Sequence, residues 1–231
     1  MKILGLECSA AAAGAAIVSD GKLLSEAYLN IGLTHSETLM PLIDTVLNFA
    51  KLDISDIDLF AVSNGPGSFT GLRIGVGTIK GLAMGQNKPV CGVSSLKALC
   101  YNVKNAEGLI APIMDARRGE VYNGLYKWDG DTLCEIEPMR AIPVDKLAIE
   151  CFEGATFVGD GAAVHKARLR ELLGDKAKFA QDAFIYQRAS SVAMAAINEK
   201  EVNAEELLPV YIRKPQAERE LENKIKGENK E

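Results

Sequence analysis

The chain has 231 residues, of which 48% are hydrophobic and 25% are charged, and its formal net charge is −5. This composition is ordinary for a globular protein with one large domain or two smaller ones. An acidic chain is not expected to hold nucleic acid by itself, because such binding usually needs a basic surface. No apolar run reaches the roughly 18 residues of a membrane span, so we expect a cytoplasmic protein without membrane contact.

Cysteines and histidines are few and scattered. The chain has five cysteines without a CxxC pair, which predicts reduced thiols and no zinc knuckle. His35 and His165 lie far apart in the sequence, so we expect no histidine-based metal site. The HExxH motif is absent, which excludes that class of metallopeptidase. Cys8 has no histidine near it in the sequence and is therefore not expected to act as a nucleophile.

The first half of the chain predicts three strands, then helices alternating with strands. In chain order these are strands over 2–8, 13–18 and 23–29, a helix after Thr34, a strand over 57–62, a glycine-rich helix up to Gly85, a strand over 89–93 and a helix over 94–103. Thr34 and Glu37 fit a capping box at the start of the first helix.

The second half repeats this order of elements. We expect strands over 108–114, 120–128 and 133–140, a short helix from Pro143, a strand over 155–158, a helix over 164–173, a brief apolar stretch near Phe179 and a helix over 186–198. With a break near Asn105, the repeat predicts two α/β lobes with mixed sheets, over residues 1–104 and 105–213. Residues 214–231 are mostly charged and predict a solvated tail.

The glycine-rich helix is unusual because a glycine inside a helix costs about 1 kcal/mol relative to alanine. On a helical wheel its apolar stripe consists of Leu72, Val76, Ile79 and Ala83. A neighbouring arc of about 120° holds Gly71, Gly75, Thr78, Gly81 and Gly85. This arc predicts a nearly bare face that lets another backbone approach closely. The neighbour is either another part of the same chain or a second molecule.

Three polar segments are candidates for chemistry. The loop from Gly65 to Ser68 either presents N–H groups to a phosphate or is a tight turn with Ser68 as N-cap, and it lacks the P-loop pattern. Asp115 and Arg117 follow a strand, where they either bind a metal, phosphate or carboxylate or form a hairpin turn with paired charges. Glu7 ends the first strand, a position suited to Mg²⁺ or an attacking water in nucleotide-using α/β folds.

Five segments together resemble the TsaB (YeaZ) family. They are residues 3–9 (ILGLECS), 35–41 (HSETLMP), 65–75 (GPGSFTGLRIG), 115–122 (DARRGEVY) and 209–213 (PVYIR). The resemblance runs from residue 1 to about 217 and implies the two-lobed actin-like ATPase (ASKHA) fold, a duplicated RNase H-like unit. It also implies work with TsaD and TsaE in placing a threonylcarbamoyl group, from threonylcarbamoyl-adenylate, on the adenosine 3′ of the anticodon in tRNAs that read codons beginning with A.

The resemblance implies a non-catalytic partner of TsaD. TsaD has two metal-binding histidines after a similar helix and strand, where this chain has Ser95 and Leu99, so no metal site or catalytic residue is expected. The implied interface with TsaD consists of His35, Leu39, Gly71, Arg73, Gly75, Thr78, Gly81 and Gly85. The tRNA is expected to be held only indirectly, through the complex. A homodimer in the absence of TsaD stays open, because one docking face could pair with itself.

A nucleotide site is the remaining question. Glu7, Ser9, Asp115 and Arg117 form the implied vestigial site, and Glu7-Cys8 stands where the family typically has Asp-Thr. We expect no cofactor in the isolated chain, and a nucleotide at the interface of the complex stays open. The alternative function is an autonomous actin-like ATPase or kinase, for which Asp115 and Glu7 are the candidate acidic residues.

Overall fold

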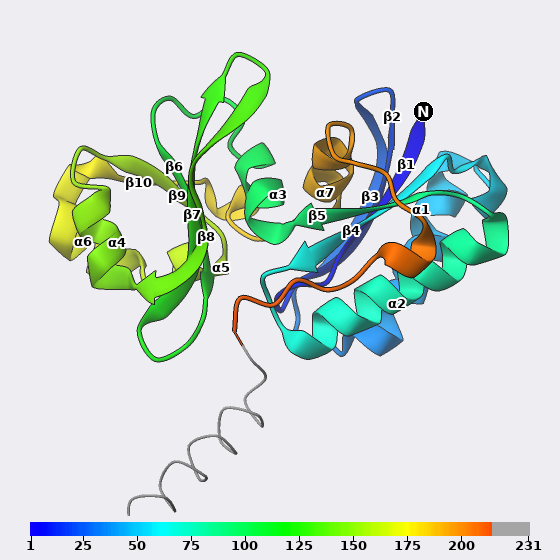
Figure 1. The fold of residues 1–231 in the computed structure, drawn as a ribbon, viewed down its shortest axis with the longest axis horizontal. Helices are drawn as coiled ribbons and strands as arrows, with labels where there is room; N and C mark the ends of the chain where they lie inside the picture. Colours follow the sequence, from blue (N-terminus) through cyan, green and yellow to red (C-terminus); the bar gives the residue numbers. More distant parts are fainter. Residues whose placement is uncertain (214–231) are drawn as a thin grey trace, which may run out of the picture.

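The structure is a computed structural model that describes residues 1–213, so the predicted tail over 214–231 lies outside the described residues. Two lobes are each built on a five-stranded mixed sheet (Figure 1). The strand orders are β3-β2-β1-β4-β5 and β10-β9-β6-β7-β8. In each sheet the first three strands pair antiparallel, and the last two run parallel to the first. The second sheet therefore repeats the topology of the first, which confirms the predicted two-lobed duplication.

The first half of the chain follows the predicted order of elements. Its strands are β1 (Lys2–Glu7), β2 (Ala13–Ser19), β3 (Lys22–Leu29), β4 (Leu59–Gly65) and β5 (Val90–Ser94), and its helices are α1 (His35–Ala50), η1 (Ile54–Asp56), α2 (Phe69–Gln86) and α3 (Ser95–Tyr101). β1 is almost entirely buried because it lies inside the sheet with helices on both faces. β3 lies at the sheet edge and is half-exposed.

The two predicted helix starts differ in how they are capped. α1 begins directly after Thr34, but the predicted capping box is wrong, because the Thr34 side chain makes no cap hydrogen bond. The N–H of Glu37 donates instead to the backbone carbonyl of Thr34 at 3.1 Å. α2 has the predicted N-cap, since Ser68 Oγ accepts from the N–H of Gly71 at 3.4 Å.

The second half departs from its prediction in three places. Its strands are β6 (Ile110–Asp115), β7 (Glu120–Asp129), β8 (Thr132–Pro143), β9 (Ala155–Val158) and β10 (Ala177–Phe179), and its helices are α4 (Val144–Glu150), α5 (Asp160–Val164), α6 (Lys166–Leu173), η2 (Gly174–Lys176), η3 (Asp182–Phe184), α7 (Ala189–Ala196) and η4 (Ala204–Glu206). The helix predicted over 164–173 is the slightly shorter α6, and a separate short helix, α5, precedes it and ends at Val164. The apolar stretch near Phe179 is the edge strand β10, and the helix predicted over 186–198 is the shorter α7.

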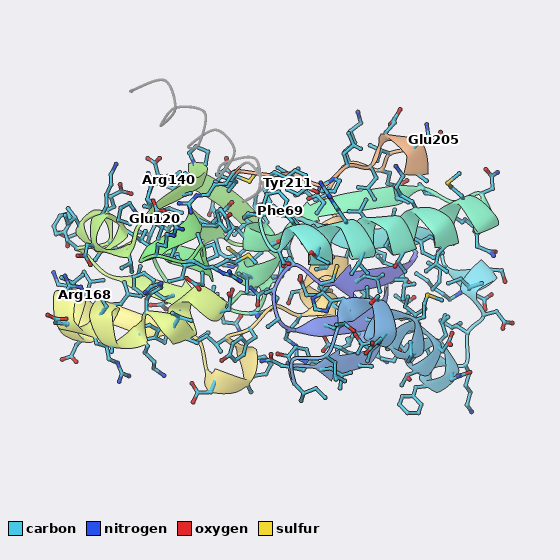
Figure 2. The ribbon with its side chains drawn as sticks, turned by 90° about the horizontal axis from the view of Figure 1, so that it is seen from below. Phe69, Glu120, Arg140, Arg168, Glu205 and Tyr211 are labelled. Atoms are coloured by element: carbon cyan, nitrogen blue, oxygen red, sulfur yellow. The ribbon has the colours of Figure 1, made fainter. Side chains whose placement is uncertain are left out.

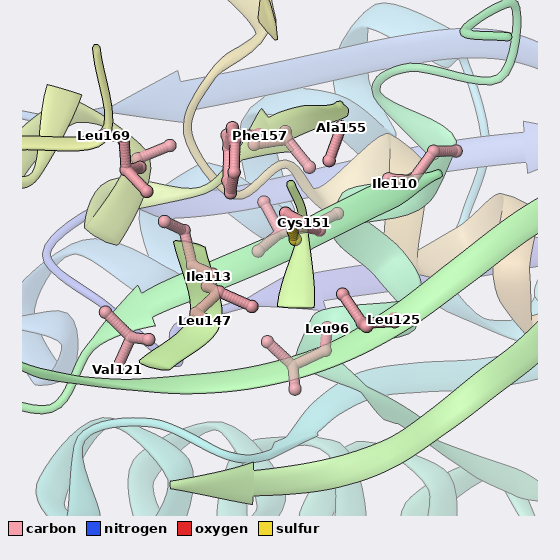
Figure 3. Close-up of a cluster of buried hydrophobic side chains, with 14 of the residues drawn as sticks. Leu96, Ile110, Ile113, Val121, Leu125, Leu147, Cys151, Ala155, Phe157 and Leu169 are labelled. Atoms are coloured by element: carbon pink, nitrogen blue, oxygen red, sulfur yellow. The ribbon is translucent and has the colours of Figure 1, made fainter. Parts of the chain in front are cut away.

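Two helices, α3 and α7, pack across the boundary between the two halves of the sequence. α7 packs on β1 and β2 of the first sheet, where Val192 and Ala193 join a core cluster with Ile3. This close packing is possible because α7 is rich in alanine. α3 instead supplies Leu96 to the core of the second lobe, as Figure 3 shows. The predicted boundary near residue 105 separates the two sheets, but α7 and residues 204–211 pack against the first lobe.

Within residues 1–213, no helix is both long and apolar enough to cross a membrane.

Candidate functional site

α2 presents three kinds of surface to its surroundings. Its predicted apolar stripe is buried against the first sheet, and it consists of Leu72, Val76, Ile79 and Ala83. Its only charged side chains are Arg73 and Lys80, and both contact residues 205–211. The arc of small residues divides between the inside and the outside of the molecule.

Gly71 and Gly75 face inward, so the prediction that they belong to a bare docking face is wrong. Both glycines are buried where the start of α2 crosses the end of β1. A Cβ atom on Gly71 would overlap the backbone carbonyl oxygen of Cys8, and one on Gly75 would overlap the Cys8 sulfur. The close approach that these glycines permit is therefore to the chain's own backbone and core.

The opposite side of the arc is open. A Cβ atom added at Gly77, Gly81 or Gly85 would meet nothing within 4 Å in the described residues. Thr70 is exposed, while Ile74 and Thr78 are half-buried. We name this uncharged surface the outward face, and it consists of Thr70, Ile74, Gly77, Thr78, Gly81 and Gly85. The helical-wheel prediction included Thr78, Gly81 and Gly85, but it missed the other three members.

The remaining residues of the predicted interface lie elsewhere. Leu39 is buried in the core of the first lobe, which contradicts its predicted place on a docking surface. The ring of His35 turns inward, with Nε2 at 2.8 Å from the carbonyl oxygen of Ala10. Arg73 is exposed, but its Nε donates to the hydroxyl of Tyr211 at 3.0 Å. Of the eight predicted interface residues, Thr78, Gly81 and Gly85 thus share one accessible, uncharged face.

The cleft between the lobes is a second candidate site. It encloses about 580 Å³. Its polar side chains are Ser9, Ser68, Thr70, Asp115, Arg117, Tyr122 and Asp160. The fold therefore brings together three of the four residues predicted for a vestigial nucleotide site, namely Ser9, Asp115 and Arg117.

Glu7, the fourth of these residues, does not line the cleft. Its carboxyl group is buried behind Ser9, whose N–H and Oγ both lie 2.6 Å from Glu7 Oε1. Oε2 has no hydrogen-bond partner among the described residues. Burial without a neighbouring cation raises the pKa of Glu7 from 4.5 to about 7, although the bonds from Ser9 oppose the shift. A carboxyl group in this position is unsuited to holding a metal ion in the cleft.

The buried Glu7 predicts a specific dependence of stability on pH. Because folding raises its pKa, the folded chain binds more protons than the unfolded chain between pH 4.5 and about 7. The free energy of unfolding should therefore fall through this window as pH rises, by on the order of 3 kcal/mol, and then level off. Glu7→Gln keeps an oxygen that accepts from the Ser9 donors, and it should remove this fall in the free energy of unfolding with pH. Urea unfolding at about pH 5 and about pH 8 measures it, and an equal pH dependence in both proteins would contradict the assignment.

The hairpin between β6 and β7 forms one wall of the cleft. Arg117 and Arg118 both have positive φ, at 63° and 58°, and the N–H of Arg117 donates to Asp115 Oδ1 at 3.0 Å. Within residues 1–213, neither guanidinium group lies within 4.0 Å of a carboxylate, so the interpretation of a turn with paired charges is wrong for these two side chains. The Asp115 carboxylate is 3.6 Å from His165 Nε2.

Asp160 faces the same cleft and links several elements. Its carboxylate accepts hydrogen bonds from Gln187 Nε2 at 2.6 Å and from the N–H of Asp115 at 3.3 Å. Burial raises its pKa, and these two bonds act in the opposite direction. Asp160 therefore ties the end of β6 to the segment before α7.

The two positions that the resemblance implies for the metal-binding histidines of TsaD lie on α3. Ser95 and Leu99 are both buried there, and neither side chain offers the nitrogen ligand of a histidine. In the described part of the chain, no three His, Cys, Asp or Glu residues come together in a way that could hold a metal ion.

Comparisons with known proteins give a matching family model and similar chains. Residues 31–221 match the family model described as TsaD, tRNA N6-adenosine threonylcarbamoyltransferase. The tRNA threonylcarbamoyladenosine biosynthesis protein TsaB of Bacillus subtilis is 32% identical over 94% of this chain and 96% of its own length. YeaZ from Pseudomonas aeruginosa has a TM-score of 0.77 at 28% identity, covering 91% of this chain and 99% of that one.

A more distant structure supports the fold alone. The ROK hexokinase from Thermus thermophilus has a TM-score of 0.50 at 13% identity, covering 86% of this chain and 98% of its own. Together with the repeated sheet topology, this likeness identifies the two-lobed actin-like fold. The match to TsaB covers nearly the whole of both sequences and therefore identifies the family within this fold. The chain therefore belongs to the TsaB (YeaZ) family of tRNA threonylcarbamoyladenosine biosynthesis proteins, which shares the family model of TsaD.

Proposed function

We propose that this chain is a non-catalytic subunit that acts with TsaD and TsaE in tRNA modification. The modification is transfer of a threonylcarbamoyl group from threonylcarbamoyl-adenylate to the adenosine 3′ of the anticodon, in tRNAs that read codons beginning with A. In this proposal the chain docks on TsaD through the outward face of α2 and thereby activates it. Membership of the TsaB family supports a role in tRNA threonylcarbamoyladenosine synthesis. The geometry of α2 supports docking on TsaD.

The uncovered outward face is the observation that carries the proposal. Three glycines on this face weaken the helix by about 3 kcal/mol relative to alanine, and a Cβ atom added at any of them would meet nothing within 4 Å in the described residues. Small residues let a second helix approach the backbone of α2, because larger side chains hold helix axes apart. The face is also free of charge, so a partner would not need to desolvate an ion when it packs there. These features fit a helix of TsaD.

Two further observations support a non-catalytic role. Ser95 and Leu99 replace the nitrogen ligands that the resemblance places in TsaD, which assigns metal chemistry to the partner. The net charge of −5 argues against a strong grip on RNA by this chain alone. In the proposed complex, TsaD binds the tRNA and carries out the transfer, while this chain supplies the docking surface.

Reconstitution of the transfer reaction tests this proposal. With TsaD, TsaE, threonylcarbamoyl-adenylate and a tRNA transcript, we expect modified adenosine only when this chain is present. The chain without TsaD should give none. Mass spectrometry of the digested tRNA measures the product. Modification by TsaD and TsaE at an undiminished rate without this chain would refute the proposed role.

The polar cleft supports a second candidate function, an autonomous actin-like ATPase or kinase. Asp115 and Arg117 line the same cavity as the hydroxyl side chains of Ser9 and Ser68. Against this function, the Glu7 carboxyl group lies behind Ser9 and is not available to a cleft ligand. Calorimetric titration of the isolated chain with Mg-ATP separates the two functions. Tight binding with turnover would favour the ATPase over the non-catalytic subunit.

A further inference from the structure

The end of the described chain forms an extended strap over both lobes. We name residues 204–213 the strap. It begins beside α2, where Lys80 Nζ donates to the carbonyl oxygens of Glu205 and Leu207 at 3.1 and 3.2 Å. The N–H of Val210 then donates to the carbonyl oxygen of Asn64 at 2.7 Å. Gly65 is required at this crossing, because a Cβ atom there would overlap the carbonyl oxygen of Val210.

The middle of the strap is fixed to the first turn of α2. The ring of Tyr211 stacks on Phe69, with centroids 4.5 Å apart and an interplanar angle of 24°. Its hydroxyl accepts from Arg73 Nε at 3.0 Å. Figure 2 shows the rings of Phe69 and Tyr211 side by side at the end of α2 that faces the second lobe. The stack and the hydrogen bond hold one point of the strap to the first lobe.

The last residue of the strap is fixed to the second lobe. Arg213 forms an ion pair with Glu120 and donates from Nη1 to the carbonyl oxygen of Ala116 at 3.2 Å. Its guanidinium carbon lies 5.6 Å from the centroid of the Tyr122 ring. Ala116 and Tyr122 also line the inter-lobe cleft, as Phe69 does from the other side. The strap therefore joins opposite walls of the same cleft.

The chain also crosses between the lobes at two places that lie together. The segments after α3 and before α7 are joined where Asn102 Nδ2 donates to the carbonyl oxygens of Phe184 and Tyr186, both at 2.7 Å. None of these three residues lines the cleft. Figure 1 shows α3 and α7 together between the lobes, with the strap passing below them. Paired crossings of this kind form a hinge, which allows rigid lobes to rotate unless a second contact fixes them.

We infer that the strap is a clasp that fixes the angle between the lobes, by holding the cleft wall at Ala116 and Tyr122 to the start of α2. The clasp couples α2 to the width of the cleft. The lobes keep one orientation only while the strap remains bound both to α2 and to the second lobe. It also holds Arg73 and Lys80 away from the outward face. That the clasp keeps the outward face uncharged for TsaD rests on the proposed function. The clasp itself is tested on the chain alone.

Distance measurement between spin labels on the two lobes tests the clasp. Asp44→Cys on α1 and Lys146→Cys on α4 carry the labels in the full chain, and Cys134→Ser removes the one half-buried native thiol. With the strap intact we expect one narrow distance distribution. Arg213→Glu should broaden it, because the reversed charge opposes Glu120 and removes the bond to Ala116. Adding Glu120→Arg should restore most of the narrow distribution by reforming the ion pair.

A matched control separates the clasp from a general effect of charge. Arg168→Glu makes the same charge change at the ion pair with Asp145, which lies entirely within the second lobe, and should leave the distribution narrow. Tyr211→Ala releases the strap at its other anchor without a change of charge and should broaden the distribution as Arg213→Glu does. Thermal melts verify that each variant is folded. An unchanged distribution in folded Arg213→Glu and Tyr211→Ala, or equal broadening by Arg168→Glu, would overturn the clasp.

Discussion

Gly71→Ala is expected to destabilise the chain by at least about 2 kcal/mol, although alanine is the better helix former. The added methyl group would overlap the carbonyl oxygen of Cys8, a backbone atom that cannot rotate away, and it would lie 3.0 Å from the ring of His35. Either α2 or the end of β1 must shift. Gly75→Ala should have a similar effect through the Cys8 sulfur and Val62. Urea unfolding of each variant measures the free energy lost.

Gly81→Ala is the matched control for this prediction, because it makes the same change in the same helix. The new methyl group has open space, so we expect a gain of up to about 1 kcal/mol from helix propensity. The two substitutions should therefore change the free energy of unfolding in opposite directions. Equal effects at Gly71 and Gly81 would show that the inward and outward faces of α2 have been assigned wrongly.

The contrast between these glycines shows how far a helical wheel could carry the prediction. The apolar stripe and the N-cap at Ser68 were predicted correctly, because both depend on spacing within one helix. The wheel placed Gly71, Gly75 and Gly81 in one wide arc. It could not show that the part of the arc next to the stripe crosses β1, while the other part stays open. That division depends on how α2 lies on its sheet.

Long-range contacts limited the rest of the prediction. The repeated order of strands and helices gave two lobes, but α7 returns to the first lobe, which no periodicity in its own sequence indicates. The strap has no regular pattern, and its contact between Tyr211 and Arg73 spans 138 residues. In the cleft, the hairpin residues Asp115 and Arg117 were found as a charged turn after a strand. Glu7 was misplaced, because its position at a strand end did not reveal that Ser9 covers it.

Gly81→Leu is expected to weaken the binding of TsaD by roughly 100-fold or more, or about 3 kcal/mol. Gly81 lies in the middle of the outward face, where a leucine side chain would hold a docked helix away from the backbone of α2. The variant should remain folded, since the site is exposed and leucine favours a helix more than glycine does. Gly77→Leu should act in the same way, because Gly77 lies on the same open face. Thermal melts of the isolated variants establish that they are folded.

Lys146→Leu serves as the control for an exposed leucine as such. Lys146 is exposed on α4 in the second lobe, far from α2 in the fold (Figure 1). We expect this variant to bind TsaD as the unmodified chain does. A loss of binding equal to that of Gly81→Leu would attribute the effect to nonspecific association and not to the outward face.

Calorimetric titration of TsaD into the unmodified chain, Gly81→Leu and Lys146→Leu tests the proposed docking most directly. We predict a 1:1 complex for the unmodified chain and for Lys146→Leu, and little or no heat of binding for folded Gly81→Leu. Binding of TsaD by Gly81→Leu with undiminished affinity would contradict the assignment of the outward face. Absence of any complex between TsaD and the unmodified chain would contradict the proposed role itself.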